Sequence, residues 1–489
     1  MTTNPLPSMP DNALWRVAEP AELPAAPAGP ALPAAFIGRP DLQREDAEDL
    51  LGWLRAGCAA PDPTGPRPRV AVVGGGISGL GAAWALRQGA QATLFEADSR
   101  LGGHANTVDL TLEGVTHGVD TGFLVCNERT YPLLLTLFDR LGVALAPSRM
   151  GFSVQQMDSG LEWAGNNLNS VFAQRGNLLR PSFLGLLADL LRFNRLTTAL
   201  ARRDADAALD LPLQDFLDEQ GFGDAFRDGY LLPMIACIWS CPAEQMLRFP
   251  VGTLIRFCHN HGLLQVNDRP QWLTVRGGSR EYVQRMQAAL PRVRTQQAVR
   301  GIQRRPDGGV RLRTDLGHED FDAVVLACHS DQALALLEAP SSAEQRLLGA
   351  IRYQRNRALL HLDERLLPTR RRAWAAWNFE AGSSDDARRP VCLHYWLNEL
   401  QPLPWQQPVI VSLNPLREPQ RVQAEFDYAH PVFDLAALRA QRGLGEIQGR
   451  GGVWFAGAWT RYGFHEDGLM SGLSAAHALL RQQMRSAAT

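Results

Sequence analysis

Short apolar runs at both ends of the chain have the pattern of buried parallel strands. Residues 70–73 are four successive apolar residues rich in β-branched side chains, and residues 92–95 form a second run of this kind. Parallel strands are usually covered on both faces, so they appear as continuous apolar runs and not as an alternation. The runs 321–326 and 452–456 predict further strands. One sheet is therefore expected to combine segments that lie far apart in the sequence.

A glycine-rich segment, Gly74-Gly75-Gly76-Ile77-Ser78-Gly79, joins the first run to the helix-forming residues 80–87. The second run ends at Glu96, 22 positions beyond Gly74. Strand, glycine turn, helix and strand in this order predict a βαβ unit that binds the pyrophosphate of a dinucleotide. The helix N-terminus presents free N–H groups and a positive dipole end to the phosphates. Glu96 is expected to accept hydrogen bonds from a ribose diol.

Each glycine of this turn has its own physical role. Gly74 permits the tight bend, Gly76 lets the backbone approach the pyrophosphate, and Gly79 lets the helix pack closely on the strand.

The middle of the chain, residues 151–290, is mainly helical in character. Its stretch 180–203 is apolar and is surrounded by arginines. We expect an amphipathic helix that buries one face in the protein; the second interpretation is contact with a membrane surface through the arginines and leucines. After this region, alternating residues 299–314 around Pro306-Asp-Gly-Gly309 predict a β-hairpin.

Composition narrows the classes of function. The chain has 489 residues, of which 45% are hydrophobic and 20% are charged, as in globular proteins. This length suits about three domains or two large interwoven ones. The 49 basic and 51 acidic side chains leave a net charge of −2, which argues against a nucleic-acid-binding protein. The sequence contains no lysine, so a mechanism that needs a side-chain amine is excluded.

The seven cysteines are scattered and contain no Cys-x-x-Cys pair. Cys237 and Cys241 with His259 and His261 fit no common zinc spacing, so we predict separate buried thiols, no metal site and a reducing compartment. The absence of an apolar run of about 18 residues and of a secretory pattern predicts a cytoplasmic protein, with the inner membrane face as the alternative location.

The residues after Glu96 distinguish between nucleotide cofactors. Residues 96–104 have the form E-A-x-x-R-x-G-G-x. Together with Val119-Asp120-Thr121-Gly122, Phe455-Ala456-Gly457-Ala458-Trp459 and Asp467-Gly468-Leu469, this segment resembles the flavin amine oxidase and phytoene desaturase superfamily. The matches cover most of residues 67–485 in order, with the middle similar only in outline. Tyr131-Pro-Leu-Leu and Arg276-Gly-Gly-Ser279 further resemble a bacterial group of amine-oxidase-like proteins, some of which look like fatty-acyl desaturases.

The resemblance implies an α/β fold: a Rossmann-like FAD-binding domain of the amine oxidase kind with an interleaved α+β substrate domain. The FAD-binding domain would comprise residues 67–150, 291–345 and 446–489. The substrate domain would comprise residues 151–290 and 346–445, and residues 1–66 form a Pro/Ala-rich extension that holds 12 of the 32 prolines. The residues that would bind FAD are Gly74, Gly76, Ile77, Ser78, Gly79, Glu96, Ala97, Arg100, Gly102, Gly103, His104, Val299, Gly457, Gly468 and Leu469.

Three departures from the family pattern matter. Position 104 holds His where the family usually has Arg. We therefore expect the positive charge that faces the pyrophosphate to depend on pH. Position 458 holds Ala where many relatives have Glu. Many amine oxidases of the superfamily use a lysine-bound water at flavin N5, and this chain has no lysine to supply it.

The function implied is hydride abstraction from a hydrophobic substrate, with a fatty-acyl or lipid desaturase as the leading interpretation. The alternatives are a flavin amine oxidase and a non-catalytic flavin-binding partner of a lipid-modifying complex. No second nucleotide motif is present, so electrons would leave to oxygen, a quinone or a protein carrier. The catalytic residues are not identified by the sequence; the candidates are Arg276, Tyr462, His465, Glu466 and Asp467.

Overall fold

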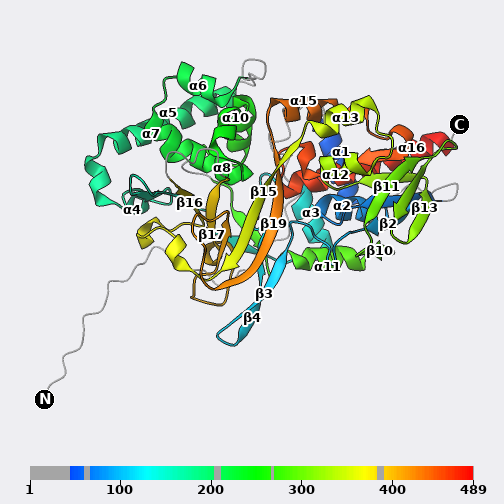
Figure 1. Ribbon diagram of the computed structural model, residues 1–489, viewed down its shortest axis with the longest axis horizontal. Helices are drawn as coiled ribbons and strands as arrows, with labels where there is room; N and C mark the ends of the chain where they lie inside the picture. Colours follow the sequence, from blue (N-terminus) through cyan, green and yellow to red (C-terminus); the bar gives the residue numbers. More distant parts are fainter. Residues whose placement is uncertain (1–43, 60–66, 203–210, 266–268, 383–389, 488–489) are drawn as a thin grey trace.

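A five-stranded sheet and a seven-stranded sheet organise the chain, and they lie side by side along its long axis (Figure 1). The computed structural model describes residues 44–59, 67–202, 211–265, 269–382 and 390–487. Most of the Pro/Ala-rich extension 1–66 and all of residues 203–210, which include the last position of the predicted stretch 180–203, therefore lie outside the described residues. Of the extension, α1 (Arg44–Arg55) is described, and its Leu50, Leu51 and Leu54 are buried.

The five-stranded sheet has the order β10-β2-β1-β14-β20, and its strands pair in parallel. Its strands are β1 (Arg69–Val73), β2 (Gln91–Phe95), β10 (Val293–Arg294), β14 (Ala323–Leu326) and β20 (Val453–Phe455). Helix α2 (Ile77–Leu86) connects β1 to β2, and α16 (His465–Ala487) packs on α2. The expectation of one parallel sheet built from distant segments is confirmed, and the apolar runs belong to it because both of its faces are covered.

Smaller β elements and helices surround this sheet. The predicted hairpin at 299–314 is confirmed as β11 (Val299–Arg304) paired with β12 (Val310–Thr314), and β13 (Gly317–Phe321) extends it. The other elements on this side are β3 (Thr107–Leu112), β4 (Val115–Asp120), β5 (Cys126–Asn127), α3 (Pro132–Leu141), β6 (Leu145–Ser148), β9 (Trp272–Val275), α11 (Arg280–Ala288), α12 (Ser330–Leu336), α13 (Ser342–Gly349) and α15 (Leu435–Gly443).

The seven-stranded sheet has the order β19-β15-β18-β17-β16-β7-β8. Its strands are β7 (Phe152–Gln156), β8 (Leu161–Ala164), β15 (Arg352–His361), β16 (Trp377–Ala381), β17 (Cys392–Trp396), β18 (Ile410–Leu413) and β19 (Val422–Val432). The helices of the middle region gather at the far end of this sheet (Figure 1). They are α4 (Leu168–Val171), α5 (Pro181–Arg202), α6 (Leu213–Glu219), α7 (Asp224–Phe226), α8 (Leu232–Trp239), α9 (Ala243–Leu247) and α10 (Val251–Asn260), and α14 (Leu397–Leu400) follows β17.

The mainly helical description of residues 151–290 needs a correction at both ends. The segment begins with the hairpin β7–β8, and β7 pairs in parallel with β16 about 220 residues later. Near its end, β9 pairs with β5 and β6. The sequence did not predict β7, because a single short strand with polar residues such as Ser153 and Gln155 gives only a weak β-strand pattern. Its strand partners come from distant parts of the chain and are not visible in the local sequence.

The tightest packing in the first half of the fold joins α2 to α16. A Cβ atom at Gly472 would lie 2.1 Å from the carbonyl oxygen of Ser78, and one at Gly468 would lie 2.8 Å from Cγ2 of Ile77. All ten residues of α2 are buried. The two helices can therefore approach this closely only because α16 carries glycine at both positions.

Among the helices of the described residues, none combines the length and the apolar character that crossing a membrane requires.

The close contact of α2 and α16 predicts a selective effect on stability. Gly472→Ala should lower the free energy of unfolding by about 1–3 kcal/mol, since its methyl group has no space beside the Ser78 carbonyl. Gly52→Ala is the matched control, because nothing lies within 4 Å of a Cβ at this exposed position of α1 and alanine favours a helix by about 1 kcal/mol. Urea unfolding of both variants measures the difference. Equal stability of the two variants would contradict the packing described.

Candidate active site

The glycine turn lies at the carboxyl end of β1. At two of its positions, the surrounding backbone leaves no space for a side chain. Gly74 has φ +109°, and a Cβ there would lie 2.7 Å from the carbonyl oxygen of Ala327. A Cβ at Gly79 would lie 1.8 Å from the carbonyl oxygen of Gly74. By contrast, nothing lies within 4 Å of a Cβ built on Gly76. The space in front of Gly76, at the N-terminus of α2 with Ile77 and Ser78 in its first turn, is the space that a pyrophosphate needs.

Glu96 anchors this turn to the end of β2. Its Oε2 accepts a hydrogen bond from the Gly75 N–H at 2.6 Å, and its Oε1 accepts one from the Asp98 N–H at 2.8 Å. The carboxylate is half-buried, so it keeps lone pairs that can face a ligand. The Gln297 N–H donates to the carbonyl oxygen of Glu96 at 2.9 Å, which brings the start of β11 and Val299 beside Glu96. The structure therefore brings Val299 near the acidic end of β2.

The Gly102-Gly103 pair forms a second wall against the first turn. The Gly102 N–H donates to the carbonyl oxygen of Gly75 at 2.8 Å, and Gly103, at φ +56°, comes so close that its Cβ would lie 3.3 Å from Cα of Gly76. The Arg100 guanidinium closes this loop by donating to the carbonyl oxygens of Gly103 and Ala105 at 2.9 and 3.3 Å. Ala97 is exposed at the outer edge of the same segment.

His104 follows the Gly102-Gly103 pair, and the Nε2 atom of its half-buried imidazole is shielded from solvent. Its ring stacks on Tyr428 at 4.9 Å between centroids and lies 5.2 Å from the ring of His430. Burial, and then the neighbouring His430, lower the pKa of His104 well below its usual value, so the ring is neutral near pH 7. The expected titratable charge is therefore not present under neutral conditions. Within the described part of the chain the Nε2 atom of His104 has no hydrogen-bond partner, which suits a polar group of a bound cofactor.

The C-terminal candidates for FAD binding, Gly457, Gly468 and Leu469, lie beside the glycine turn, and we refer to the space between these segments as the crevice. Residue Ala456 follows β20 and donates its N–H to the Leu326 carbonyl at the end of β14, so Gly457 leaves the sheet beside the glycine turn. The Gly457 N–H donates to Oγ of Ser471 in α16 at 2.8 Å. Gly468 packs on the first turn of α2, and Leu469 follows it. Segments near residues 74, 102, 299 and 457 thus converge at the carboxyl ends of parallel strands, where open α/β sheets bind their ligands.

Asp120 is a buried carboxyl that connects three other segments of the chain, near residues 107, 279 and 401. It accepts hydrogen bonds from the Ser279 N–H at 2.9 Å, from Oγ1 of Thr107 at 2.6 Å and from Nε2 of Gln401 at 2.9 Å. Burial raises the pKa of Asp120 to about 6, although these hydrogen bonds act in the opposite direction. Through Asp120, the motif 119–122 therefore connects the loop that ends at Thr107 to the loop that contains Gly277 and Gly278.

A pocket of about 460 Å³, including its mouth, opens beside the start of α16. Its walls come from Thr130-Tyr131 before α3, from the end of α10, and from residues 461–470. The lining residues are Thr130, Tyr131, Phe257, Asn260, His261, Arg461, Tyr462, Phe464, Glu466, Asp467 and Met470. Burial lowers the pKa of His261 to about 4, so its imidazole is neutral in the pocket wall.

The catalytic candidates separate into two groups. Tyr462, Glu466 and Asp467 line the pocket. His465 points away from it, because its ring stacks on Phe123 at 3.8 Å and its Nε2 lies 3.1 Å from the Tyr282 hydroxyl; burial lowers its pKa to about 3. Arg276 is exposed just after β9 and does not line the pocket. The structure therefore does not bring Arg276 and His465 together with the other three.

Glu466 is the most perturbed carboxyl of the pocket. Burial raises its pKa to about 8, and the N–H groups of Leu133 and Leu134, at 2.8 and 2.9 Å, act in the opposite direction. These donors belong to the first turn of α3, so Glu466 links α16 to the helix N-terminus. The α10 residues Phe257, Asn260 and His261 were not expected at this site, since nothing in a distant helix signals which pocket it will line.

Comparisons with known proteins bear on the family of this chain. Residues 77–398 match the family model described as flavin containing amine oxidoreductase. The carotenoid phi-ring synthase of Streptomyces griseus is 29% identical over 303 residues, which cover 56% of this chain and 55% of that protein. The (S)-6-hydroxynicotine oxidase of Paenarthrobacter nicotinovorans is 26% identical over 284 residues, 56% of this chain and 63% of that protein. The matched part is thus less than two thirds of either curated relative.

Among solved structures, a fatty acid isomerase from P. acnes that produces CLA superposes with a TM-score of 0.59 at 15% identity, covering 85% of this chain and 98% of that one. At this identity the likeness concerns the fold alone, and it agrees with the expected α/β architecture.

The open space at Gly76 predicts an effect on FAD and not on folding. Gly76→Ala should leave the unfolding midpoint of the FAD-free protein nearly unchanged, since its methyl group meets no protein atom within 4 Å, but should weaken FAD binding at least about tenfold by occupying the phosphate space. Titration of FAD into the FAD-free protein, followed by flavin fluorescence, measures the affinity. Gly185→Ala, also without neighbours within 4 Å, is the control. Unchanged FAD affinity of Gly76→Ala would place the pyrophosphate elsewhere.

Proposed function

We propose, on the premise that this chain belongs to the flavin-containing amine oxidoreductase family and uses FAD, that it oxidises a hydrophobic substrate at carbon and leaves a C=C bond. The chain is a FAD-dependent oxidoreductase, and the substrate class is the new element of the proposal. A fatty-acyl or lipid chain is the substrate we favour over an amine.

The observation that carries this proposal is the composition of the pocket wall. Five of its residues are aromatic or apolar: Tyr131, Phe257, Tyr462, Phe464 and Met470. These five of the eleven lining residues offer apolar surface to a hydrocarbon, whose burial contributes about 25 cal/mol per Å², and the six polar or charged residues of the wall leave room for a polar head. Asp467 on the same wall directly precedes Gly468 and Leu469, which are the residues proposed to approach the flavin. The pocket therefore brings an apolar lining next to the proposed site of chemistry.

The lysine-free sequence supports the same choice. Amine oxidases of this superfamily commonly use a lysine-bound water at flavin N5, and this chain cannot provide that arrangement. The amine-oxidase alternative keeps some support from the similarity to a hydroxynicotine oxidase. A flavin-binding protein without turnover is the third alternative.

Bound FAD supplies the hydride acceptor. The protein's part is to hold the substrate, exclude water and take up the proton that leaves the neighbouring carbon when the double bond forms. Asp467 is the carboxylate proposed for this proton: it lines the pocket, and its Oδ2 accepts a hydrogen bond from the Phe464 N–H at 3.0 Å. The two electrons then leave to oxygen, a quinone or a protein carrier.

Anaerobic reduction of the bound flavin distinguishes these functions. Fatty-acyl and lipid donors are expected to bleach the flavin absorbance, whereas polyamines and aromatic amines are not. Asp467→Asn should slow bleaching by about 10²-fold at equal FAD content, the usual contribution of a positioned base, and Asp218→Asn on the exposed side of α6 is the control. Bleaching by amines alone would favour the amine oxidase, and no bleaching by any donor would favour the non-catalytic alternative.

We also propose that the helical end of the protein rests on an anionic membrane surface, from which a lipid substrate would come. Residues 168–202 contain five arginines and one acidic residue, Asp189. The exposed large apolar residues of this stretch are Leu168, Leu178, Leu179, Leu184 and Leu191, of which Leu179 is 88% exposed. They lie on and around α4 and α5, at the end of the molecule far from the five-stranded sheet (Figure 1).

Helix α5 explains this surface by its two faces. Phe183, Leu186 and Phe193 are buried against the protein, as the amphipathic interpretation expected. Leu184, Leu191 and Arg195 are exposed at a helical spacing, on the opposite face. Leucines among arginines suit the boundary between anionic headgroups and acyl chains.

Vesicle flotation tests this surface. The protein should float with vesicles that contain phosphatidylglycerol and not with pure phosphatidylcholine, and raising the salt concentration should weaken binding. The double variant Leu179→Asp, Leu184→Asp should lose most of the binding, at about 0.8 kcal/mol per CH₂ group removed from the membrane. Leu316→Asp, at an 84% exposed residue between β12 and β13, is the matched control. Equal flotation of the two variants would exclude this surface.

A further inference from the structure

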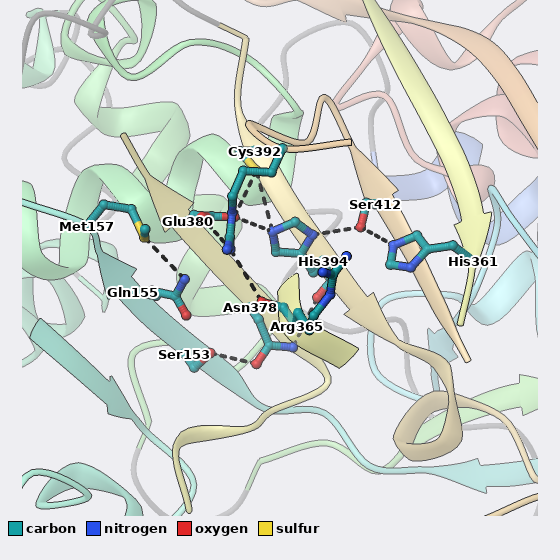
Figure 2. Close-up of polar contacts among 11 residues, drawn as sticks. Ser153, Gln155, Met157, His361, Arg365, Asn378, Glu380, Cys392, His394 and Ser412 are labelled. Carbon is teal, nitrogen blue, oxygen red and sulfur yellow. Dashed lines mark hydrogen bonds and ion pairs between the residues drawn. The ribbon is translucent and has the colours of Figure 1, made fainter. Parts of the chain in front are cut away.

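A row of buried polar side chains crosses the seven-stranded sheet, far from the crevice described above. Glu380 on β16 pairs in register with Cys392 on β17, and Asn378 pairs with His394. Since residues two apart on a strand point to the same face, Glu380, Cys392 and His394 share one face of the sheet (Figure 2). All three are at most 3% exposed. A carboxylate, a thiol and an imidazole are the three side-chain types that bind Zn²⁺.

The donor atoms of these three residues are already close together. Nε2 of His394 lies 2.8 Å from Oε2 of Glu380 and 3.5 Å from Sγ of Cys392, and the Glu380–Cys392 pair is 3.8 Å apart. Donors around a tetrahedral Zn²⁺ are separated by roughly 3.3–3.6 Å, given zinc–ligand distances of about 2.0–2.3 Å. Two of the three separations are near this range, and the third is shorter because a proton joins the imidazole to the carboxylate. Opening that hydrogen bond by about half an ångström gives the coordination geometry.

Neighbouring groups hold each donor in place. Nδ1 of His394 lies 2.6 Å from Oγ of Ser412, and Arg417 donates to Oε1 of Glu380 at 3.1 Å. These contacts leave Nε2 and Oε2 facing the centre of the group, as outer partners do in metal sites. Burial and the neighbouring Glu380 raise the pKa of the Cys392 thiol, while the Leu416 N–H acts in the opposite direction, so the thiol is protonated until a metal replaces its proton.

The chain of hydrogen bonds continues from Ser412 to Nε2 of His361 at 2.7 Å, and Nδ1 of His361 accepts the Asp363 N–H at 3.1 Å. Without a metal, this backbone donor directs the protons along the chain so that Nε2 of His394 carries the proton that faces Glu380.

A further polar side chain, Gln155, neighbours the group on the adjacent strand. Gln155 on β7 pairs in register with Glu380, on the other side of β16 from Cys392. Its Oε1 is buried, and among the residues that the structure describes it has no hydrogen-bond partner.

We propose that Glu380, Cys392 and His394 form a zinc site, with a water as the fourth ligand, that links β16 to β17. Binding releases the thiol proton of Cys392 to solvent and moves the Nε2 proton of His394 to Nδ1. Zn²⁺ together with one thiolate and one carboxylate is then electrically neutral, as a buried site requires. The metal can enter past Arg417, whose side chain covers Glu380 and is 48% exposed.

Metal analysis of the full-length, FAD-loaded protein without an affinity tag tests the site. After incubation with zinc chloride and removal of free metal, we expect about one zinc per chain by mass spectrometry. X-ray absorption should show one sulfur ligand at about 2.3 Å with nitrogen and oxygen ligands. Zinc should raise the unfolding midpoint of the wild-type protein.

Matched variants assign the ligands. Cys392→Ser should lose the bound zinc and its effect on the unfolding midpoint, whereas Cys258→Ser, at a buried thiol of α10, should retain both. Ser412→Ala leaves the three ligands in place but removes the hydroxyl that joins His394 to His361, and it should weaken zinc binding about 10–100-fold. If Cys392→Ser does not fold, Ser412→Ala and the wild-type spectrum still decide the question. Less than a tenth of an equivalent in the wild type, no sulfur ligand, or full retention by Ser412→Ala would overturn the proposal.

Discussion

The close approach of two glycines to backbone carbonyls is the constraint on which the rest of the structure depends. Gly79 packs against the Gly74 carbonyl, and Gly472 packs against the Ser78 carbonyl. The first contact holds α2 on the end of β1, and the second holds α16 on α2. Because a side chain at Gly79 would push α2 away from β1 and one at Gly472 would push α16 away from α2, both distances are set by the lack of Cβ atoms. The crevice proposed for the cofactor lies where these two helices start.

Carboxyl groups with little solvent exposure then join separate segments, some of them hundreds of residues apart. Glu96 holds the glycine turn, Asp120 holds Ser279 and Gln401, and Glu466 holds the first turn of α3. Each accepts N–H groups that would otherwise be unsatisfied inside the protein, so the cost of burying the carboxylate is offset by backbone hydrogen bonds. This arrangement makes the crevice and the pocket beside α16 parts of one connected framework. Burial raises the pKa values of Asp120 and Glu466, and the hydrogen bonds that they accept limit this rise.

The seven-stranded sheet carries both a large apolar cluster and a row of buried polar side chains. Helices such as α8 pack against one part of it with residues of the large apolar cluster, and the row from Ser153 to Ser412 is polar and buried. A buried polar row is stable only when its groups satisfy one another, which the hydrogen bonds Ser153–Asn378 and His394–Ser412 achieve. The basic, leucine-rich surface of α5 lies beyond this sheet, so the proposed membrane contact and the flavin crevice lie at different ends of the molecule (Figure 1).

By itself, the sequence determined the parallel sheet, the glycine turn with Glu96, the hairpin at 299–314 and the amphipathic α5, because strand burial, turn chemistry and helical periodicity are local properties of the chain. Only the tertiary structure decided that β7 pairs with β16, that α10 lines the pocket, that the His104 imidazole is neutral, and that His465 and Arg276 stay outside the pocket. Register, burial and electrostatic environment depend on partners distant in sequence. Such partners become neighbours only when apolar surfaces pack, and for that reason no local pattern records them.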